Sequence, residues 1–170
     1  MSSSALVSRL LPTVRKQGIS FIAYVPDNAF SGFLSAAKVE QGIQLVNATR
    51  EEEAIGIACG AYLAGGKPIV VMQSSGLGNS LNALGSLVVP YQIPLVMFVN
   101  VRGALGEWNV AQSPLGANTG AVLKAMNVPH VSVTDSEHVT QKVGAAIEFS
   151  FSTRQPIGVL FEYPIFGESL

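Results

Sequence analysis

The chain alternates between amphipathic stretches and short, continuous apolar runs. In the N-terminal segment, apolar side chains recur every three or four residues, which is typical of a helix that packs one face on a core: Leu6, Leu10, Leu11 and Val14. Residues 68–72 (PIVVM) and 93–99 (IPLVMFV) are instead continuously apolar and bounded by turn residues. Such runs are typical of strands that are buried on both faces of a parallel sheet. We therefore expect helices on both sides of the sheet.

The same alternation continues to the end of the chain. It predicts strands at residues 19–25, 43–46, 68–72, 93–99, 130–133 and 157–161. A first helix ends at Gly18, and further helices are expected at 29–39, 51–63, 77–87, 115–126 and 136–149. Units of this kind build an α/β fold. The sequence therefore predicts a single domain, residues 1–170, as a three-layer sandwich with a central parallel sheet of about six strands.

Four loops follow the carboxyl ends of the predicted strands: residues 26–28, 47–51, 73–79 and 100–112. Ligands of open α/β sheets bind outside these ends. Because the four loops hold most of the polar residues that have no structural explanation, we expect the functional site at this edge.

Composition narrows the class of protein. Only 12% of the 170 residues are charged, while 48% are hydrophobic. This charged fraction is about half the usual one, which indicates interfaces with other subunits. The net charge of −1, with Lys and Arg scattered singly, argues against a nucleic-acid-binding surface. No apolar run is long enough for a membrane helix and the N-terminus does not resemble a signal peptide, so we expect a cytoplasmic protein. The single cysteine, Cys59, is interpreted as a small core residue.

An acidic triplet, Glu51 to Glu53, opens the third predicted helix. It has a purely structural explanation, because Thr49 is placed to cap this helix and the helix dipole favours negative charge in the first turn. Successive residues of a helix turn by about 100°, so at most one or two of the three carboxylates can face the sheet edge. One carboxylate kept away from water is enough for acid–base chemistry.

The turn at residues 73–79 (QSSGLGN) opens the next helix. Its glycines would let a ligand approach the backbone closely, although a tight strand-to-helix connection also explains them. The turn matches neither phosphate-binding motif, since GxxxxGK[ST] is absent and Leu81 occupies the place of the last glycine in GxGxxG. His130 and His138 lack the partners of a zinc site, and no GxSxG motif supports a Ser-His-Asp triad. We expect no metal site on this chain.

Four segments together resemble the pyrimidine-binding domain of thiamine diphosphate-dependent decarboxylases: YVPDNAF, TREEEAIGIACGAYLAGGKP, QSSGLGNSLNALGSL and RGALGEWNVAQSPLG. The resemblance covers nearly the whole chain. It implies that Glu51 is the family's activating glutamate, which hydrogen-bonds N1′ of the aminopyrimidine and favours the imino tautomer that takes the proton from thiazolium C2. Ala54, Ala58 and Gly60, at the family's spacing, would let this helix pack beside the cofactor. Glu52 and Glu53 would then be solvated or lie at an interface.

The resemblance also implies the other contacts. The cofactor would contact Pro26, Glu51, Ser74, Ser75, Gly76 and Asn79, although relatives often have Asn at the position of Ser74. The substrate would contact Asp27, Asn28, Ser75, Arg102 and Gln112, and Trp108 and Asn109 lie in the same loop as the last two. Arg102 suits a forked sulfonate or phosphonate oxyanion, but an arginine that anchors the loop is an equally good interpretation.

A Gly-Asp-Gly motif, through which the family binds Mg²⁺ and diphosphate, does not occur in the sequence. The resemblance therefore implies a separate beta subunit that holds Mg²⁺ and the diphosphate of thiamine diphosphate, with at least two copies of each chain. The favoured reaction is decarboxylation of sulfopyruvate to sulfoacetaldehyde, and phosphonopyruvate is the alternative substrate. Two other classes remain: a non-catalytic binding or regulatory subunit, and, ranked last, a flavodoxin-like nucleotide-binding protein.

Overall fold

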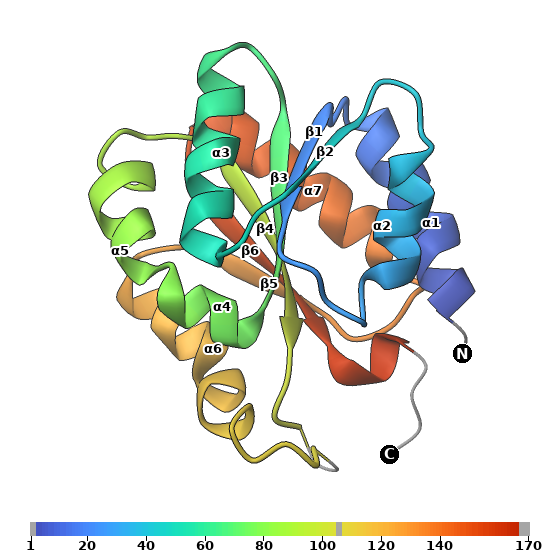
Figure 1. Cartoon of the computed structure of the whole chain (residues 1–170), viewed down its shortest axis with the longest axis vertical. Coiled ribbons are helices and arrows are strands. Elements are labelled where there is room, and N and C mark those ends of the chain that lie inside the picture. The colour runs from blue at the N-terminus through green and yellow to red at the C-terminus, as the bar shows by residue number, and fades with distance from the viewer. Residues whose placement is uncertain (1–2, 105–106, 167–170) are drawn as a thin grey trace.

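The computed structural model describes residues 3–104 and 107–166, which form a six-stranded sheet and the helices around it (Figure 1). In chain order the elements are α1 (Ser3–Lys16), β1 (Phe21–Tyr24), α2 (Ser31–Lys38), β2 (Gln44–Asn47), α3 (Glu51–Leu63), β3 (Pro68–Gln73), α4 (Ser74–Asn79), α5 (Leu81–Ala83), η1 (Leu84–Val88), β4 (Leu95–Val101), α6 (Ser113–Ala125), β5 (His130–Val133), α7 (Val139–Thr153), β6 (Pro156–Glu162) and η2 (Tyr163–Phe166). No helix among the described residues is long and apolar enough to cross a membrane.

All neighbouring strands of the sheet are parallel, in the order β2-β1-β3-β4-β6-β5. The chain runs from β1 outward to β2 and then returns to β3 on the other side of β1, so the direction of winding reverses there. Ligands of such sheets bind at a reversal of this kind. The register pairs Gln73 with Asn100, which brings the loops after β3 and β4 together beside the loop after β1.

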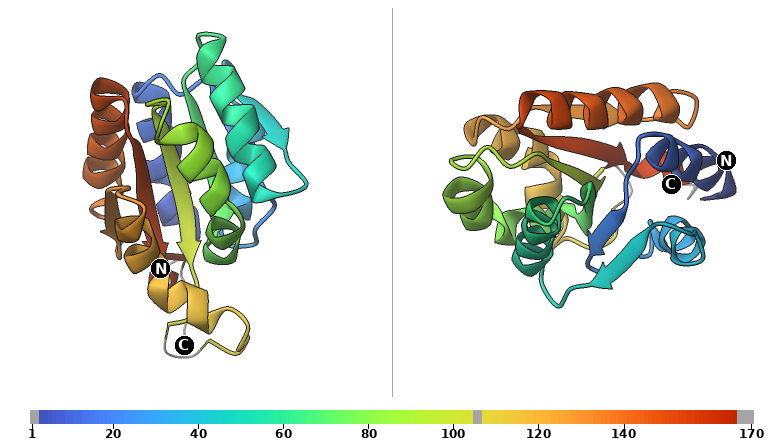
Figure 2. Two further views of the ribbon diagram at one scale, coloured as in Figure 1. Left: turned by 90° about the vertical axis from the view of Figure 1, so that its left-hand side faces the viewer. Right: turned by 90° about the horizontal axis from the view of Figure 1, so that it is seen from above.

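Two hydrophobic cores lie on opposite faces of the sheet. One core is shared with α1, α2 and α7, and the other with α3, α4, η1 and α6 (Figure 2). In β3, Ile69 and Val71 belong to the first core, while Val70 and Met72 belong to the second. This alternation explains why the run was continuously apolar. The predicted three-layer sandwich with a parallel sheet is confirmed.

Two predicted helices differ most from those observed, while α2 and α6 differ from the prediction by one or two residues at their ends. The helix expected at residues 77–87 begins at Ser74, directly after β3, and is interrupted at Ser80. There the hydroxyl of Ser80 donates to the carbonyl of Gly76 at 2.9 Å, and a wide π-helical turn, η1, follows. The helix expected at 136–149 is shifted to Val139–Thr153, because Asp135 accepts the backbone N–H of His138 and holds the preceding residues in a turn. By contrast, α3 has the predicted bounds, residues 51–63.

Candidate active site

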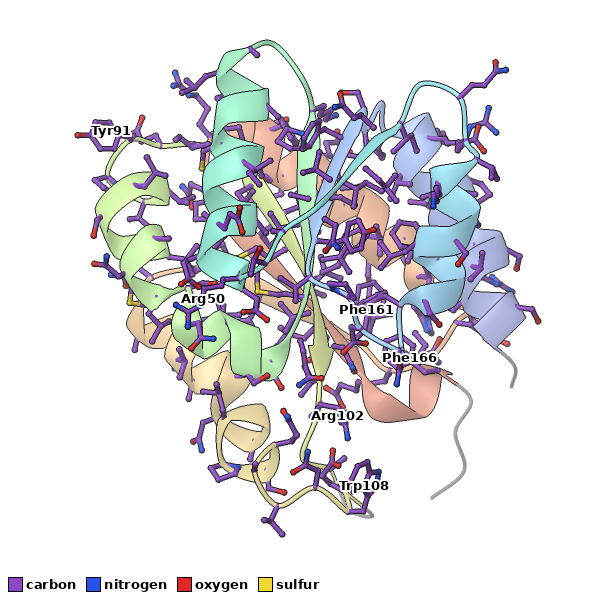
Figure 3. The ribbon with its side chains drawn as sticks, in the orientation of Figure 1. Arg50, Tyr91, Arg102, Trp108, Phe161 and Phe166 are labelled. Carbon is purple, nitrogen blue, oxygen red and sulfur yellow. The ribbon has the colours of Figure 1, made fainter. Side chains whose placement is uncertain are left out.

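A cavity of about 370 Å³ opens at the carboxyl ends of β1, β3 and β4. Its lining combines five residues named from the sequence (Pro26, Asp27, Asn28, Arg102 and Trp108) with four that were not singled out (Ala29, Gln73, Asn100 and Phe166). Figure 3 shows Arg102, Trp108 and Phe166 at the same end of the molecule. Phe166 is held there by edge-on packing against Phe30, with ring centroids 5.3 Å apart.

The carboxylate of Asp27 is held by neutral donors. Its Oδ1 accepts the backbone N–H of Ala29 at 2.7 Å, which forms a local turn after β1. The amide nitrogen of Asn100 lies 3.2 Å from both Asp27 oxygens. Asn100 is only 1% exposed, and its own Oδ1 is buried without a hydrogen-bond partner among the described residues. Sequence analysis missed Asn100, because an asparagine at the end of a strand looks like an ordinary loop residue.

A second group of polar side chains centres on Gln73, which also lines the cavity. Its amide nitrogen donates to Ser75 Oγ at 2.9 Å and to Gln112 Oε1 at 2.8 Å. Gln73, which the sequence analysis did not single out, therefore links two predicted site residues, Ser75 and Gln112. Ser74, in contrast, is fully buried, and its hydroxyl accepts the backbone N–H of Arg102 at 3.3 Å. Asn79 is exposed at the end of α4.

Arg102 forms a two-pronged ion pair with Glu107 in the loop after β4. Nε and Nη2 of Arg102 donate to the two Glu107 oxygens, each at 2.7 Å, and the two side chains are 16% and 4% exposed. Glu107 also accepts the backbone N–H groups of Gly103 and Asn109. The hydrogen bonds from Arg102 are the main reason that the pKa of Glu107 falls from 4.5 to about 2. In this geometry Arg102 anchors the loop. The sequence analysis did not identify Glu107 as its partner.

Glu51 begins α3, and its side chain lies directly against Gly76 of α4. A Cβ atom at position 76 would overlap Cγ, Cδ and Oε1 of Glu51, so the carboxylate fits only because residue 76 is a glycine. The acidic triplet and the glycine turn are therefore in contact in the fold. Glu51 is half-buried in the isolated chain and lies outside the described lining of the cavity.

The other two carboxylates of the triplet have different surroundings. Glu52 pairs with Arg50 at 3.4 Å, and its Oε2 is buried without a partner among the described residues. Glu53 is exposed and accepts the backbone N–H of Thr49 at 2.7 Å. The prediction that Thr49 caps α3 is wrong. Residue 50 occupies the cap position and contributes no side-chain hydrogen bond, because the glutamate of the first turn reaches back instead.

The small residues of α3 differ in their surroundings. Ala54 and Ala58 are fully buried in the core that α3 shares with the sheet, whereas Gly60 is exposed with no atom within 4 Å of an added Cβ. The two alanines therefore bring α3 close to the sheet. Their effect on the site is indirect, since they fix where Glu51 begins the helix.

The side chains at this edge suit an organic ligand better than a metal ion. Among residues 3–104 and 107–166, no cluster of three or more His, Cys, Asp or Glu side chains could hold a metal ion. A heterocyclic ligand fits better, because Glu51 offers a half-buried carboxylate after the carboxyl end of β2, and the missing side chain of Gly76 leaves room for that carboxylate. Amide and carboxylate groups on Asp27, Gln73 and Asn100 line the adjoining cavity.

Comparison with known proteins gives a consistent result. Residues 5–114 match the family described as thiamine pyrophosphate enzyme, N-terminal TPP binding domain. The alpha subunit of sulfopyruvate decarboxylase from Methanococcus maripaludis is 37% identical over 85% of this chain and 87% of its own length. Phosphonopyruvate decarboxylase from Streptomyces viridochromogenes is 30% identical over 87% of this chain but only 39% of its own length.

Among solved structures, that of a putative thiamin diphosphate-dependent enzyme isolated from Mycobacterium smegmatis superposes with a TM-score of 0.75. The sequence identity is 17%, and the alignment covers 92% of this chain and 30% of that enzyme. This likeness shows a shared fold, while the family match and the identity to the M. maripaludis subunit show common descent. The chain therefore belongs to the family of the N-terminal TPP-binding domain of thiamine pyrophosphate enzymes.

Proposed function

We propose that residues 1–170 form the pyrimidine-binding subunit of a thiamine diphosphate-dependent decarboxylase that converts sulfopyruvate to sulfoacetaldehyde and carbon dioxide. The observation that carries this proposal is the contact of Glu51 with Gly76, which sets a carboxylate at the ligand-binding edge of the sheet. The relative from M. maripaludis, matched over 87% of its length, supports the choice of substrate.

When bound, thiamine diphosphate supplies a nucleophilic carbon and an electron sink for the electron pair left by carbon dioxide. Glu51 would hold a proton between its carboxylate and the ring nitrogen N1′ of the aminopyrimidine. Pro26, Ser75, Gly76 and Asn79 would contact the cofactor. Ser74 would support the turn from behind, since its hydroxyl already bonds the backbone of residue 102.

The cavity lined by Asp27, Gln73 and Asn100 is proposed to receive the 2-oxo acid. Asp27 and Asn28 would face the substrate from the loop after β1, and Gln112 would act through the bonds that Gln73 makes to it and to Ser75. Arg102 lines the same cavity and is the cationic side chain in its described lining, although Glu107 engages two of its nitrogens. Its guanidinium would supply favourable charge to the sulfonate while Glu107 fixes its position.

A partner subunit is part of the proposal. The M. maripaludis relative is named as an alpha subunit, and the phosphonopyruvate decarboxylase contains more than twice the length that this chain covers. We infer a beta subunit that binds Mg²⁺ and the diphosphate, with at least two copies of each chain and the active site at their boundary. The exposed apolar side chains of Trp108 and Val110, beside the cavity, suit burial against another subunit.

The test replaces Glu51 in the assembled enzyme with its cofactor. Glu51→Ala should lower kcat for sulfopyruvate by about 10³-fold, because the proton at N1′ is no longer held. Glu53→Ala is the matched control, since this carboxylate is exposed on the same helical turn and bonds only the backbone of residue 49 among the described residues. Its kcat should be close to that of the unmodified enzyme. Equal rates for both variants would refute the proposed mechanism.

Two alternatives are separated by direct measurements. A non-catalytic subunit predicts that thiamine diphosphate does not bind the assembled complex, which titration calorimetry decides. A phosphonopyruvate decarboxylase is favoured by the 30% identity to the Streptomyces enzyme. Side-by-side turnover of sulfopyruvate and phosphonopyruvate by the same complex distinguishes these substrates.

A further inference from the structure

Asn100 lies next to the last residue of β4, in the wall of the cavity, and is 1% exposed. It contacts Asp27 in the loop after β1, although the two residues are 73 positions apart in the chain. We propose that Asn100 is a positioning residue that fixes the orientation of the Asp27 carboxylate toward the substrate. This inference rests on the proposed function, because it assigns Asp27 a contact with the substrate of that reaction.

The amide nitrogen of Asn100 is placed to fix the plane of the Asp27 carboxylate. An Asp carboxylate has a broad terminal torsion, so one hydrogen bond to one oxygen leaves its plane poorly determined. The backbone N–H of Ala29 binds Oδ1 at 2.7 Å, and the nitrogen of Asn100 lies at the same distance, 3.2 Å, from Oδ1 and Oδ2. The two donors together restrict both the direction and the rotation of the carboxylate, while Asp27 still lines the cavity.

The same side chain also carries an acceptor that has no partner among the described residues. The Oδ1 atom of Asn100 is buried and has no hydrogen-bond partner in the described part of the chain. Buried polar atoms are normally paired, because leaving one unpaired destabilises the fold. A leucine of similar size would avoid this penalty and suit the surrounding strand, in which Val99 is fully buried. Stability alone would therefore not select asparagine here, whereas the donor that holds Asp27 would.

The test is a double-mutant cycle in the assembled enzyme. Asn100→Leu should lower kcat/KM for sulfopyruvate by roughly 10- to 100-fold, because a displaced carboxylate meets the substrate in the wrong geometry. In the background of Asp27→Ala, the same substitution should change kcat/KM by no more than about twofold, since its effect acts through the carboxylate that is already absent. Asn100→Ala, which adds no new contact, serves as a second variant if the leucine variant does not fold.

Ser150→Ala is the control for a purely structural effect. Ser150 is fully buried, and its hydroxyl donates to the carbonyl of Gln155 at 2.6 Å, at the opposite edge of the sheet. This variant should lower the thermal stability and leave kcat/KM unchanged in both backgrounds. If the losses from Asn100→Leu and Asp27→Ala instead multiply, or if Asn100→Leu retains the unmodified rate, the inference is wrong.

A crystal structure of the Asn100→Leu chain separates this inference from the proposed function. If the unmodified complex turns over neither sulfopyruvate nor phosphonopyruvate, the proposed function fails, but the orientation of Asp27 can still be measured. We expect the carboxylate to rotate away from its position in the unmodified chain. An unchanged carboxylate plane would overturn the positioning role whatever the enzyme does.

Discussion

The polar side chains at the two ends of the parallel strands form their hydrogen bonds in different ways. The end at which the strands begin is called the amino edge, and the end at which they finish is called the carboxyl edge. At the amino edge, side chains bond mainly to backbone atoms: Lys67 Nζ donates to the carbonyl of Gln17, and Ser150 to that of Gln155, both at 2.6 Å. At the carboxyl edge, side chains bond backbone as well, but they also bond to one another, as in the pairs of Asp27 with Asn100, Gln73 with Gln112, and Arg102 with Glu107.

This difference separates stability from function. Bonds to backbone close the ends of the strands and leave few polar atoms facing a ligand. Pairs of side chains join loops that are distant in sequence and can respond to a ligand without unfolding the backbone. We therefore expect substitutions at the amino edge to alter mainly stability, and those at the carboxyl edge to alter mainly catalysis, unless they displace backbone.

The largest effect on stability is expected at the carboxyl edge where α6 packs against the backbone of the loop after β4. A Cβ on Gly116 of α6 would overlap the carbonyl of Arg102, so Gly116→Ala should lower the free energy of unfolding by about 3 kcal/mol. Urea denaturation measures this loss. Gly60→Ala is the matched control, because nothing lies within 4 Å of its added Cβ. It should stabilise α3 by up to about 1 kcal/mol. If Gly116→Ala unfolds like the unmodified chain, the contact between α6 and the loop after β4 is not as tight as described.

Gly76→Ala should have the opposite effect, a loss of activity with little loss of stability, and would sharpen the comparison between the two edges most clearly. The new methyl group displaces the flexible side chain of Glu51, so we expect kcat of the assembled enzyme to fall roughly 100-fold. The free energy of unfolding should change by less than about 1 kcal/mol, because alanine favours the helix and Glu51 can move aside. Steady-state kinetics and urea denaturation of the same preparation decide. Full activity would show that Glu51 need not occupy its present position.

Acid denaturation tests the ion pair in the loop after β4. The pKa of Glu107 is about 2 when folded and returns to about 4.5 when unfolded. The pair therefore stabilises the protein above about pH 4.5, and this contribution is lost as the pH falls through about 2. Glu107→Gln should lower the free energy of unfolding by about 2 kcal/mol at neutral pH. The difference between variant and unmodified protein should shrink as the pH is lowered, and a difference independent of pH would contradict this explanation.

The smallest effect is expected at the amino edge. Lys67 donates to the carbonyl of Gln17 and lies 4.7 Å from the centre of the Phe151 ring, while burial lowers its pKa. Lys67→Met keeps the apolar stem and should destabilise the fold by about 1 kcal/mol. Because the site is at the other end of the strands, kcat/KM should stay within about twofold of the unmodified value. A large loss of activity without a loss of stability would break the division between the edges.

Much of the fold could be predicted from the sequence, because it depends on local patterns. The apolar runs of β3 and β4 and the acidic start and glycine-rich end of α3 each identify an element without reference to the rest of the chain. The interruption of the helix after β3 could not be predicted. It depends on the hydrogen bond that the Ser80 hydroxyl donates and on the π-helical turn of η1, and neither changes the pattern of apolar positions.

The candidate site could be predicted only in part from the sequence, for a similar reason. Asp27 and Glu51 stand in recognisable motifs, and the carboxyl edge of the sheet follows from the order of elements. The role of Asn100 depends on a contact 73 residues distant, and the contact of Glu51 with Gly76 depends on how two helices pack. The pairing of Arg102 with Glu107 is the exception, since these residues are five apart and the short spacing could have suggested it.

The position of β6 between β4 and β5 has a consequence for biosynthesis. Of the six strands, β6 is synthesised last although it lies inside the sheet. Until residues 156–162 leave the ribosome, β4 therefore has an unpaired edge and β5 has no neighbouring strand. Unpaired edges of apolar strands attract other chains. Nascent chains stalled before residue 156 should therefore bind chaperones, and release of the seven-residue β6 should end that dependence.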